Sequence, residues 1–139
     1  MRLETERRLL QVAVAAACLV PVSAGAAGIL EGAGMVKGLA GQPPTDLDSH
    51  FRYLSGLLLG MGLAFSACIP GIERKRLLFR ALSLIVVVGG LARLFSALED
   101  GLPGSGHHFG LVMELLVVPL LMLWQGRIAR IFERRGPTS

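Results

Sequence analysis

Four long apolar segments follow one another along the chain, at residues 9–30, 53–72, 77–98 and 109–125. Each is long enough, or nearly so, to cross a hydrocarbon core about 30 Å thick. The first two contain no charged residue. Because every backbone N–H and C=O in lipid needs an internal partner, the segments are predicted to be helices. The pattern predicts an all-α, four-span transmembrane helical bundle, with residues 1–139 forming a single integral membrane domain.

A soluble four-helix bundle would show a polar face on every helix, repeating each three to four residues. Residues 82–88 and 115–121 contain no charge and leave no polar face. Composition points the same way, with 53% apolar and 17% charged residues, since soluble domains average about 45–50% and about 25%. The sequence therefore favours a membrane protein.

The basic residues lie at the ends of the apolar segments rather than in one patch. Of the 14 Lys and Arg residues, all but Lys37, Arg52 and Arg93 precede the first segment, lie at the connection of the second and third, or follow the fourth. Short loops rich in Lys and Arg stay in the cytoplasm. Both termini are therefore predicted to be cytoplasmic. The net charge of +4 reflects this flanking pattern, so no nucleic-acid partner is expected.

The basic C-terminal tail, residues 126–139, continues the helical pattern beyond the fourth segment. Its basic and large apolar residues are Arg127, Ile128, Arg130, Ile131, Phe132, Arg134 and Arg135. Helices with basic and apolar faces bind anionic leaflets. The tail is therefore expected to extend the fourth helix along the cytoplasmic leaflet, with Trp124 at the interface, where indole rings concentrate.

The first apolar segment also has features of a secretory signal peptide. Residues 9–20 have the length of its apolar core, and Ala24, Gly25 and Ala26 imitate a cleavage site. The apolar run, however, continues to Leu30, and more membrane helix follows in place of a secreted domain. These features favour a retained first span.

The longest predicted connection, residues 32–49, is rich in Gly and contains Pro43 and Pro44. Asp46 or Asp48 is expected to cap the second helix, because an aspartate side chain can accept from the first free backbone N–H groups. The second helix is expected to stop near Pro70.

Arg93 and Glu114 lie inside the third and fourth segments. Each is about five residues from the outer end of its segment, hence about 7–8 Å below the outer surface. Ionisable groups inside a membrane are costly and are the first place to look for function. Equal depth on adjacent antiparallel helices predicts a direct Arg–carboxylate pair, which lowers the cost of burying either charge.

Glycines one helical turn away indicate which way these charges face. Gly89 precedes Arg93 by four residues, and Gly110 precedes Glu114 by four. Residues four apart share a helix face, and small residues mark close helix contacts in lipid. Both charges are therefore predicted to face the bundle interior.

The second segment repeats this spacing in Asp48, Arg52, Gly56, Gly60 and Ala64. We predict a polar cluster at the outer mouth of the bundle, formed by Glu31, Asp48, Arg52, Arg93 and Glu114. His50 and Tyr53 flank Arg52 and are candidates to enlarge it as a binding mouth, although both residue types are also common at membrane interfaces. Structural ion pairing, a ligand or ion site, and catalysis all remain open for this cluster.

No motif predicts a catalytic residue, a metal site or a cofactor. The metal-like residues are His50, Glu99, Asp100, His107 and His108. Adjacent histidines rarely converge on one ion, and no histidine pair has the four-residue helical spacing. The Gly-x-Gly pairs at 32–34 and 104–106 lack a phosphate-binding lysine. Cys18 has no histidine at its depth to activate it, and it is interpreted with Cys68 as a small packing residue.

Several stretches resemble a known family. They are LDSHFRYLSGLLLG at 47–60, residues 68–74, 79–82 and 89–94, and ELLVVPL at 114–120. Their most specific positions are Asp48, Arg52, Tyr53, Arg93 and Glu114. The chain resembles, over nearly its whole length, small bacterial membrane proteins catalogued as domain of unknown function 4345. The resemblance implies a multi-pass protein of the bacterial inner membrane and carries no activity.

Two function classes follow. One is a non-enzymatic accessory or small-ligand-binding membrane module; the other is a membrane-embedded enzyme or transporter subunit that uses Arg52, Arg93 and Glu114. The first is favoured, because pairing with an arginine weakens Glu114 as a base. Besides the lipid bilayer, the expected partner is a second copy or another membrane protein. The small-residue stripes that suggest it are Ala13 with Ala17, Ser23 with Ala27, and Gly56 with Gly60.

Overall fold

The computed structural model describes residues 2–101 and 104–136, which contain helices and no strand. The α-helices are α1 (Arg2–Glu31), α2 (Thr45–Cys68), α3 (Arg76–Asp100), α4 (Ser105–Val112) and α5 (Val118–Arg135). Two 3₁₀ helices, η1 (Gly32–Met35) and η2 (Ile72–Arg74), follow α1 and α2. A π-helical turn, η3 (Met113–Val117), joins α4 to α5.

Four stretches in the described residues are long and apolar enough to cross a membrane. They are Arg2–Met35, Thr45–Cys68, Arg76–Asp100 and Ser105–Arg135. The predicted all-α fold with four membrane-spanning helices is thus confirmed. The helices are longer than the apolar segments, because hydropathy detects the lipid-facing part alone, whereas polar turns continue the backbone hydrogen bonding. The tail extends the last helix to Arg135 as predicted, and its residues 137–139 lie outside the described part.

The expected cap of α2 is wrong. Pro44 occupies the N-cap position, and no side chain there bonds the free N–H groups of the first turn. Asp46 and Asp48 lie inside that turn instead, where their charge complements the positive end of the helix dipole. The Asp48 carboxylate accepts from the backbone N–H of Ala33, outside α2. The predicted stop of α2 is nearly right, since Cys68 is its last residue.

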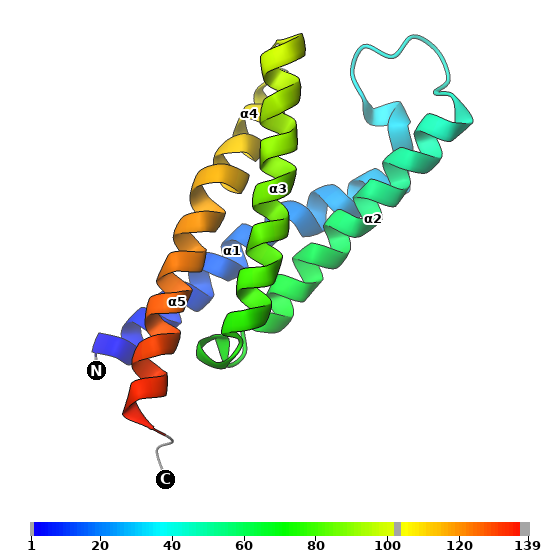
Figure 1. Cartoon of the computed structure of the whole chain (residues 1–139). Helices are drawn as coiled ribbons and strands as arrows, with labels where there is room; N and C mark the ends of the chain where they lie inside the picture. The colour runs from blue at the N-terminus through cyan, green and yellow to red at the C-terminus, as the bar shows by residue number, and fades with distance from the viewer. Residues whose placement is uncertain (1, 102–103, 137–139) are drawn as a thin grey trace. The chain divides into compact units, whose positions relative to one another are not determined.

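Contacts divide the described chain into two compact units. The hairpin unit comprises residues 12–69, and the α3–α5 unit comprises residues 2–11 and 70–136. Figure 1 shows the helices along the chain. The prediction of one integral membrane domain over residues 1–139 stays a prediction.

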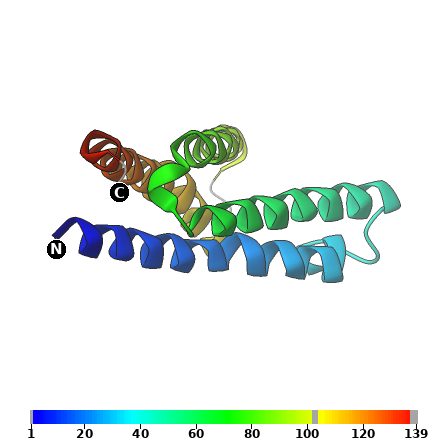
Figure 2. The same cartoon turned by 90° about the horizontal axis from the view of Figure 1, so that it is seen from below.

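In the hairpin unit, α1 and α2 lie side by side, and glycines set their separation (Figure 2). A Cβ atom on Gly25 would stand 2.6 Å from the backbone nitrogen of Leu59. One on Gly62 would stand 2.8 Å from the Val22 side chain and 3.2 Å from the ring of Pro21. These glycines therefore allow close contact of the two helices, as small residues do in membranes.

Gly56 and Gly60 do not belong to this contact, despite their four-residue spacing. A Cβ atom added at either position would meet nothing within 4 Å. The contact with α1 instead uses Ser55 and Gly62, which are buried. The stripe of Gly56 and Gly60 therefore lies outside the contact between α1 and α2, because four-residue spacing fixes a face without saying which face is covered. The prediction that it marks an interior face stays a prediction.

In the α3–α5 unit, α3 lies beside the continuous helix formed by α4, η3 and α5 (Figure 1). Phe79 and Ser83 of α3 are buried, and so are Ile128 and Ala129 of α5. Gly90 allows close approach near the middle, because a Cβ atom there would lie 2.8 Å from the Cβ of Glu114. Gly89, from which the facing of Arg93 was predicted, meets nothing within 4 Å.

The π-helical turn interrupts the last helix just before Pro119. The Val118 N–H donates to the carbonyl of Met113, five residues earlier. Proline has no N–H and its ring clashes with the carbonyl four residues before it, so a wider turn at this point relieves the crowding. Such single π turns often occur at functional sites, and this one contains Glu114.

Candidate functional site

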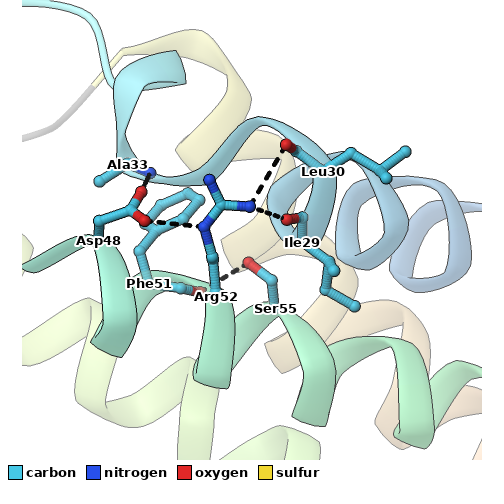
Figure 3. A network of polar contacts seen from close by, with 7 residues as sticks. All are labelled: Ile29, Leu30, Ala33, Asp48, Phe51, Arg52 and Ser55. Atoms are coloured by element: carbon cyan, nitrogen blue, oxygen red, sulfur yellow. Dashed lines mark hydrogen bonds and ion pairs between the residues drawn. The ribbon is translucent and has the colours of Figure 1, made fainter.

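The first polar site lies in the hairpin unit and is centred on Arg52 of α2 (Figure 3). The Arg52 Nε donates to Asp48 at 2.8 Å, one helical turn earlier. Its Nη1 donates to the carbonyl of Ile29 and, at 3.3 Å, to that of Leu30. These carbonyls belong to the last turn of α1, where carbonyl groups lack helical partners. Arg52 thus caps the C-terminal end of α1, and the Asp48 carboxylate neutralises the positive charge of Arg52.

The second oxygen of the Asp48 carboxylate accepts from the Ala33 N–H at 2.8 Å, at the start of η1. Gly32 makes this approach possible. Its φ is +65°, and a Cβ atom there would collide with Asp48 and Arg52. Glycine adopts this left-handed conformation without steric cost. The end of α1 is therefore joined to the start of α2 by one hydrogen-bonded group, the Arg52 cluster, which consists of Gly32, Asp48 and Arg52.

We expect Asp48→Ala to destabilise the hairpin unit by about 1–3 kcal/mol, because it leaves Arg52 and the Ala33 N–H without their shared acceptor. Asp46→Ala is the matched control, since Asp46 lies in the same first turn and is exposed. Thermal unfolding in detergent, followed by circular dichroism, would measure both. Equal losses in the two variants would show that Asp48 acts only through the helix dipole.

The second polar site lies in the α3–α5 unit and consists of Arg93, Glu114 and His107. The Arg93 Nε and Nη2 donate to the two carboxylate oxygens of Glu114 at 3.0 and 3.1 Å. The Nη1 of Arg93 lies 2.8 Å from the Nδ1 of His107. Since arginine can only donate, we assign Nδ1 of His107 as the acceptor. The predicted direct pair of Arg93 with Glu114 is confirmed, in the two-pronged geometry that arginine favours.

Two backbone features position this Arg93 cluster. A Cβ atom on Gly110 would lie 3.5 Å from the guanidinium carbon of Arg93, so the missing side chain leaves room for the guanidinium group. Glu114 lies in the π turn. The pair is only partly buried, with side chains 35% and 20% exposed for Arg93 and Glu114. The charged groups of Arg93 and Glu114 therefore pair with each other, and part of each side chain remains exposed.

The other predicted site residues have weaker roles in the described structure. Glu31 is exposed and forms no ion pair with a described residue. His50 and Tyr53 are exposed, and their rings lie 6.4 Å apart in a tilted arrangement. Neither contacts the charged groups of Arg52 through a hydrogen bond that the structure shows. The prediction of one joint cluster draws on residues of both units, and it stays a prediction.

A third polar site, not predicted from the sequence, lies in the α3–α5 unit, and we call it the Glu73 cluster. Its members are Glu6, Arg7, Glu73, Gln125 and Arg127. The Glu73 side chain is only 7% exposed, and its carboxylate lies 3.5 Å from the Arg7 Nη1. Gln125 is buried and donates to the Ile72 carbonyl at 2.7 Å. Arg127 pairs with Glu6.

The Glu73 cluster contains two buried polar atoms, Arg7 Nε and Glu73 Oε2, without hydrogen-bond partners among the described residues. The Arg7 guanidinium also lies over the Phe132 ring, 5.8 Å from its centre. The signal for this site was present in the sequence. Glu6 and Glu73 each lie within a basic stretch. An acidic residue in each stretch is a signal for acid–base pairing between the stretches, in addition to their effect on membrane orientation.

In the described residues, no three His, Cys, Asp or Glu side chains are grouped closely enough to hold a metal ion. His107 contacts Arg93 rather than an acidic neighbour. Cys18 and Cys68 are buried and free of disulfides. The chemistry of the sites is therefore that of charge pairing and hydrogen bonding.

Comparison with known proteins places the chain in a family but assigns it no role. Neither the search of curated proteins nor the search of solved structures found a match. A family model described as domain of unknown function (DUF4345) matches residues 9–125, which include all four apolar segments together with Arg52 and Arg93. The chain, with its four apolar helices, therefore belongs to the DUF4345 family.

Proposed function

We propose that this chain is a multi-pass protein of the bacterial inner membrane that acts as a non-enzymatic accessory or small-ligand-binding module. One observation carries the proposal. Both arginines of the outer region already have their charge matched, Arg52 by Asp48 and Arg93 by Glu114. An enzyme site usually keeps a base with an oriented partner beside a cavity. Here each carboxylate instead pairs with an arginine. Such ion pairs suit a role in holding helices together or in binding a polar ligand.

The alternative, an enzyme or transporter subunit using Arg52, Arg93 and Glu114, has less support. A general base must be able to take a proton, and both oxygens of Glu114 accept from Arg93. No row of pore-facing polar groups suggests a conducting path among the described helices. Because the Arg93 cluster is only partly buried, it is accessible to one polar group of a ligand or partner.

The proposed orientation places both termini in the cytoplasm. Contacts within the α3–α5 unit support it, since they bring together three of the basic stretches. Arg7 lies beside Glu73, Arg127 pairs with Glu6, and Arg76 lies 3.7 Å from Glu133. Stretches held together in this way share one side of a membrane, and their Lys and Arg content favours the cytoplasmic side.

We expect a cysteine at Lys37 to react with a membrane-impermeant maleimide added to intact cells, because the connection after η1 would face outward. A cysteine at Arg80 should react only after the cells are opened. Cys18 and Cys68 would be replaced by alanine in both variants to remove the native thiols. Labelling of Lys37→Cys only in opened cells would overturn the proposed topology.

The accessory role is tested by purification from native membranes in mild detergent, followed by mass spectrometry of copurifying proteins and small molecules. The double variant Arg93→Leu/Glu114→Leu is compared with the wild type. A protein partner retained by a folded double variant supports the accessory role. Loss of a copurifying small molecule from the folded double variant would assign the Arg93 cluster to ligand binding. A reaction product accumulating with the wild type alone would overturn the non-enzymatic proposal.

A further inference from the structure

The exposed face of α5 carries a hollow that shares only Arg127 with the sites described above. It has a volume of about 200 Å³ and is lined by Arg127, Arg130, Ile131 and Arg134. These four residues lie at helical spacings of three and four, so they share one face. The opposite face is packed, since Ile128 and Ala129 are fully buried. The hollow therefore lies between long side chains that extend from a helix whose opposite face is packed.

The arginines of the hollow carry more hydrogen-bond donors than the acceptors that bind them. Arg127 is partly committed to Glu6, and Arg130 uses its Nε for the Gly126 carbonyl at 3.1 Å. Arg134 is exposed and forms no ion pair with a described residue. Glu133, the acidic neighbour in sequence, is directed to Arg76 of α3. Three arginines thus line the hollow, whose lining residues include no carboxylate, and only Arg127 among them pairs with a described acidic residue, Glu6.

We propose that this hollow binds the phosphate group of an anionic membrane lipid. Guanidinium groups form paired hydrogen bonds with phosphate, and arginine suits phosphate recognition better than lysine does. A volume of about 200 Å³ is several times the share of one water, about 30 Å³, so it admits a phosphate group. Ile131 adds an apolar surface for the adjoining glycerol region.

Position along the helix selects a lipid as the source of the phosphate. The span Ser105–Arg135 is one continuous helical stretch, and the hollow begins two residues after buried Gln125. A helix that leaves the hydrocarbon carries its next turns into the headgroup layer, where basic side chains attract anionic lipids. This inference rests on the proposed membrane function, and it places the arginines of the hollow at the level of the lipid phosphates.

The test uses the purified full-length chain in detergent micelles, titrated with phosphatidylglycerol or with phosphatidylcholine of the same acyl chains. Native mass spectrometry counts bound lipids. We expect phosphatidylglycerol to bind at least about tenfold more tightly. Arg130→Gln and Arg134→Gln should each weaken this binding about fivefold. Arg135→Gln is the matched control, because it removes the same charge from the next residue, which does not line the hollow.

Circular dichroism checks that every variant keeps its helices. Equal weakening by Arg134→Gln and Arg135→Gln would show diffuse charge attraction and overturn the site. Equal affinity for the two lipids would do the same. Inorganic phosphate that displaces the lipid at millimolar concentration, through Arg134, would reassign the hollow to a soluble phosphate. Because a micelle has no sides, the outcome is independent of the cysteine-labelling experiment, which tests the proposed topology separately.

Discussion

Arg93→Leu is expected to lower the free energy of unfolding by about 2–3 kcal/mol, because it leaves the Glu114 carboxylate without its two guanidinium donors. Breaking a fully buried ion pair typically costs about 3–5 kcal/mol. The smaller value applies because Arg93 and Glu114 keep 35% and 20% of their side chains exposed, so the pair is not fully buried within the chain. Glu114→Leu should have a similar effect, since it strands Arg93.

The double variant Arg93→Leu/Glu114→Leu should recover more than half of the single losses, because two leucines need no partners in lipid. Unfolding in mixed micelles of increasing sodium dodecyl sulfate would give all three values. Arg80→Leu is the control, since Arg80 is an exposed arginine of the same helix, α3, and it should change stability by less than about 0.5 kcal/mol. If the double loss equals the sum of the single losses, the two charges do not act as a pair.

Gly25→Ala should destabilise the hairpin unit by about 2–3 kcal/mol, although it adds a single methyl group. The new Cβ would lie 2.6 Å from the Leu59 nitrogen, 2.8 Å from the Ser55 carbonyl oxygen and 2.9 Å from the Leu59 Cα. All three are backbone atoms, so no side-chain rotation relieves the clash. The two helices would have to separate along this contact.

Gly60→Ala is the matched control for Gly25→Ala. A Cβ atom on Gly60 meets nothing within 4 Å, and alanine favours a helix over glycine by about 0.5–1 kcal/mol. Gly60→Ala should therefore leave stability unchanged or raise it. Thermal unfolding in detergent, followed by circular dichroism, would measure both variants. A loss at Gly60 as large as that at Gly25 would mean that the face of Gly60 is covered by a second copy or another protein, as the partner prediction holds.

Hydropathy and charge placement were enough to predict the four helices and the pairing of Arg93 with Glu114. Both follow from strong physical requirements. A backbone in lipid must bond internally, and an intramembrane charge needs a partner at its own depth. The tail up to Arg135 was also predicted to be helical, because apolar residues recur among its arginines at helical spacing.

Details that depend on which face is covered were not predictable in this way. The stripe of Gly56 and Gly60 satisfies the small-residue pattern, yet Gly25 and Gly62 make the close contact. The π turn at Glu114 depends on local crowding ahead of Pro119, which spacing rules for a regular helix ignore. The Glu73 cluster was missed because its acidic members were outnumbered by neighbouring arginines.

The Glu73 cluster has a consequence for how the chain is made. Glu6 and Arg127 are 121 residues apart in sequence, so Glu6 emerges from the ribosome long before Arg127 is synthesised. Arg7 can meet Glu73 as soon as η2 is made, but Glu6 can meet Arg127 only after α5 is made, and contacts between such distant residues form slowly. Until then Glu6 is without the guanidinium group of Arg127. The Glu6–Arg127 pair thus cannot form until nearly the whole chain has been made.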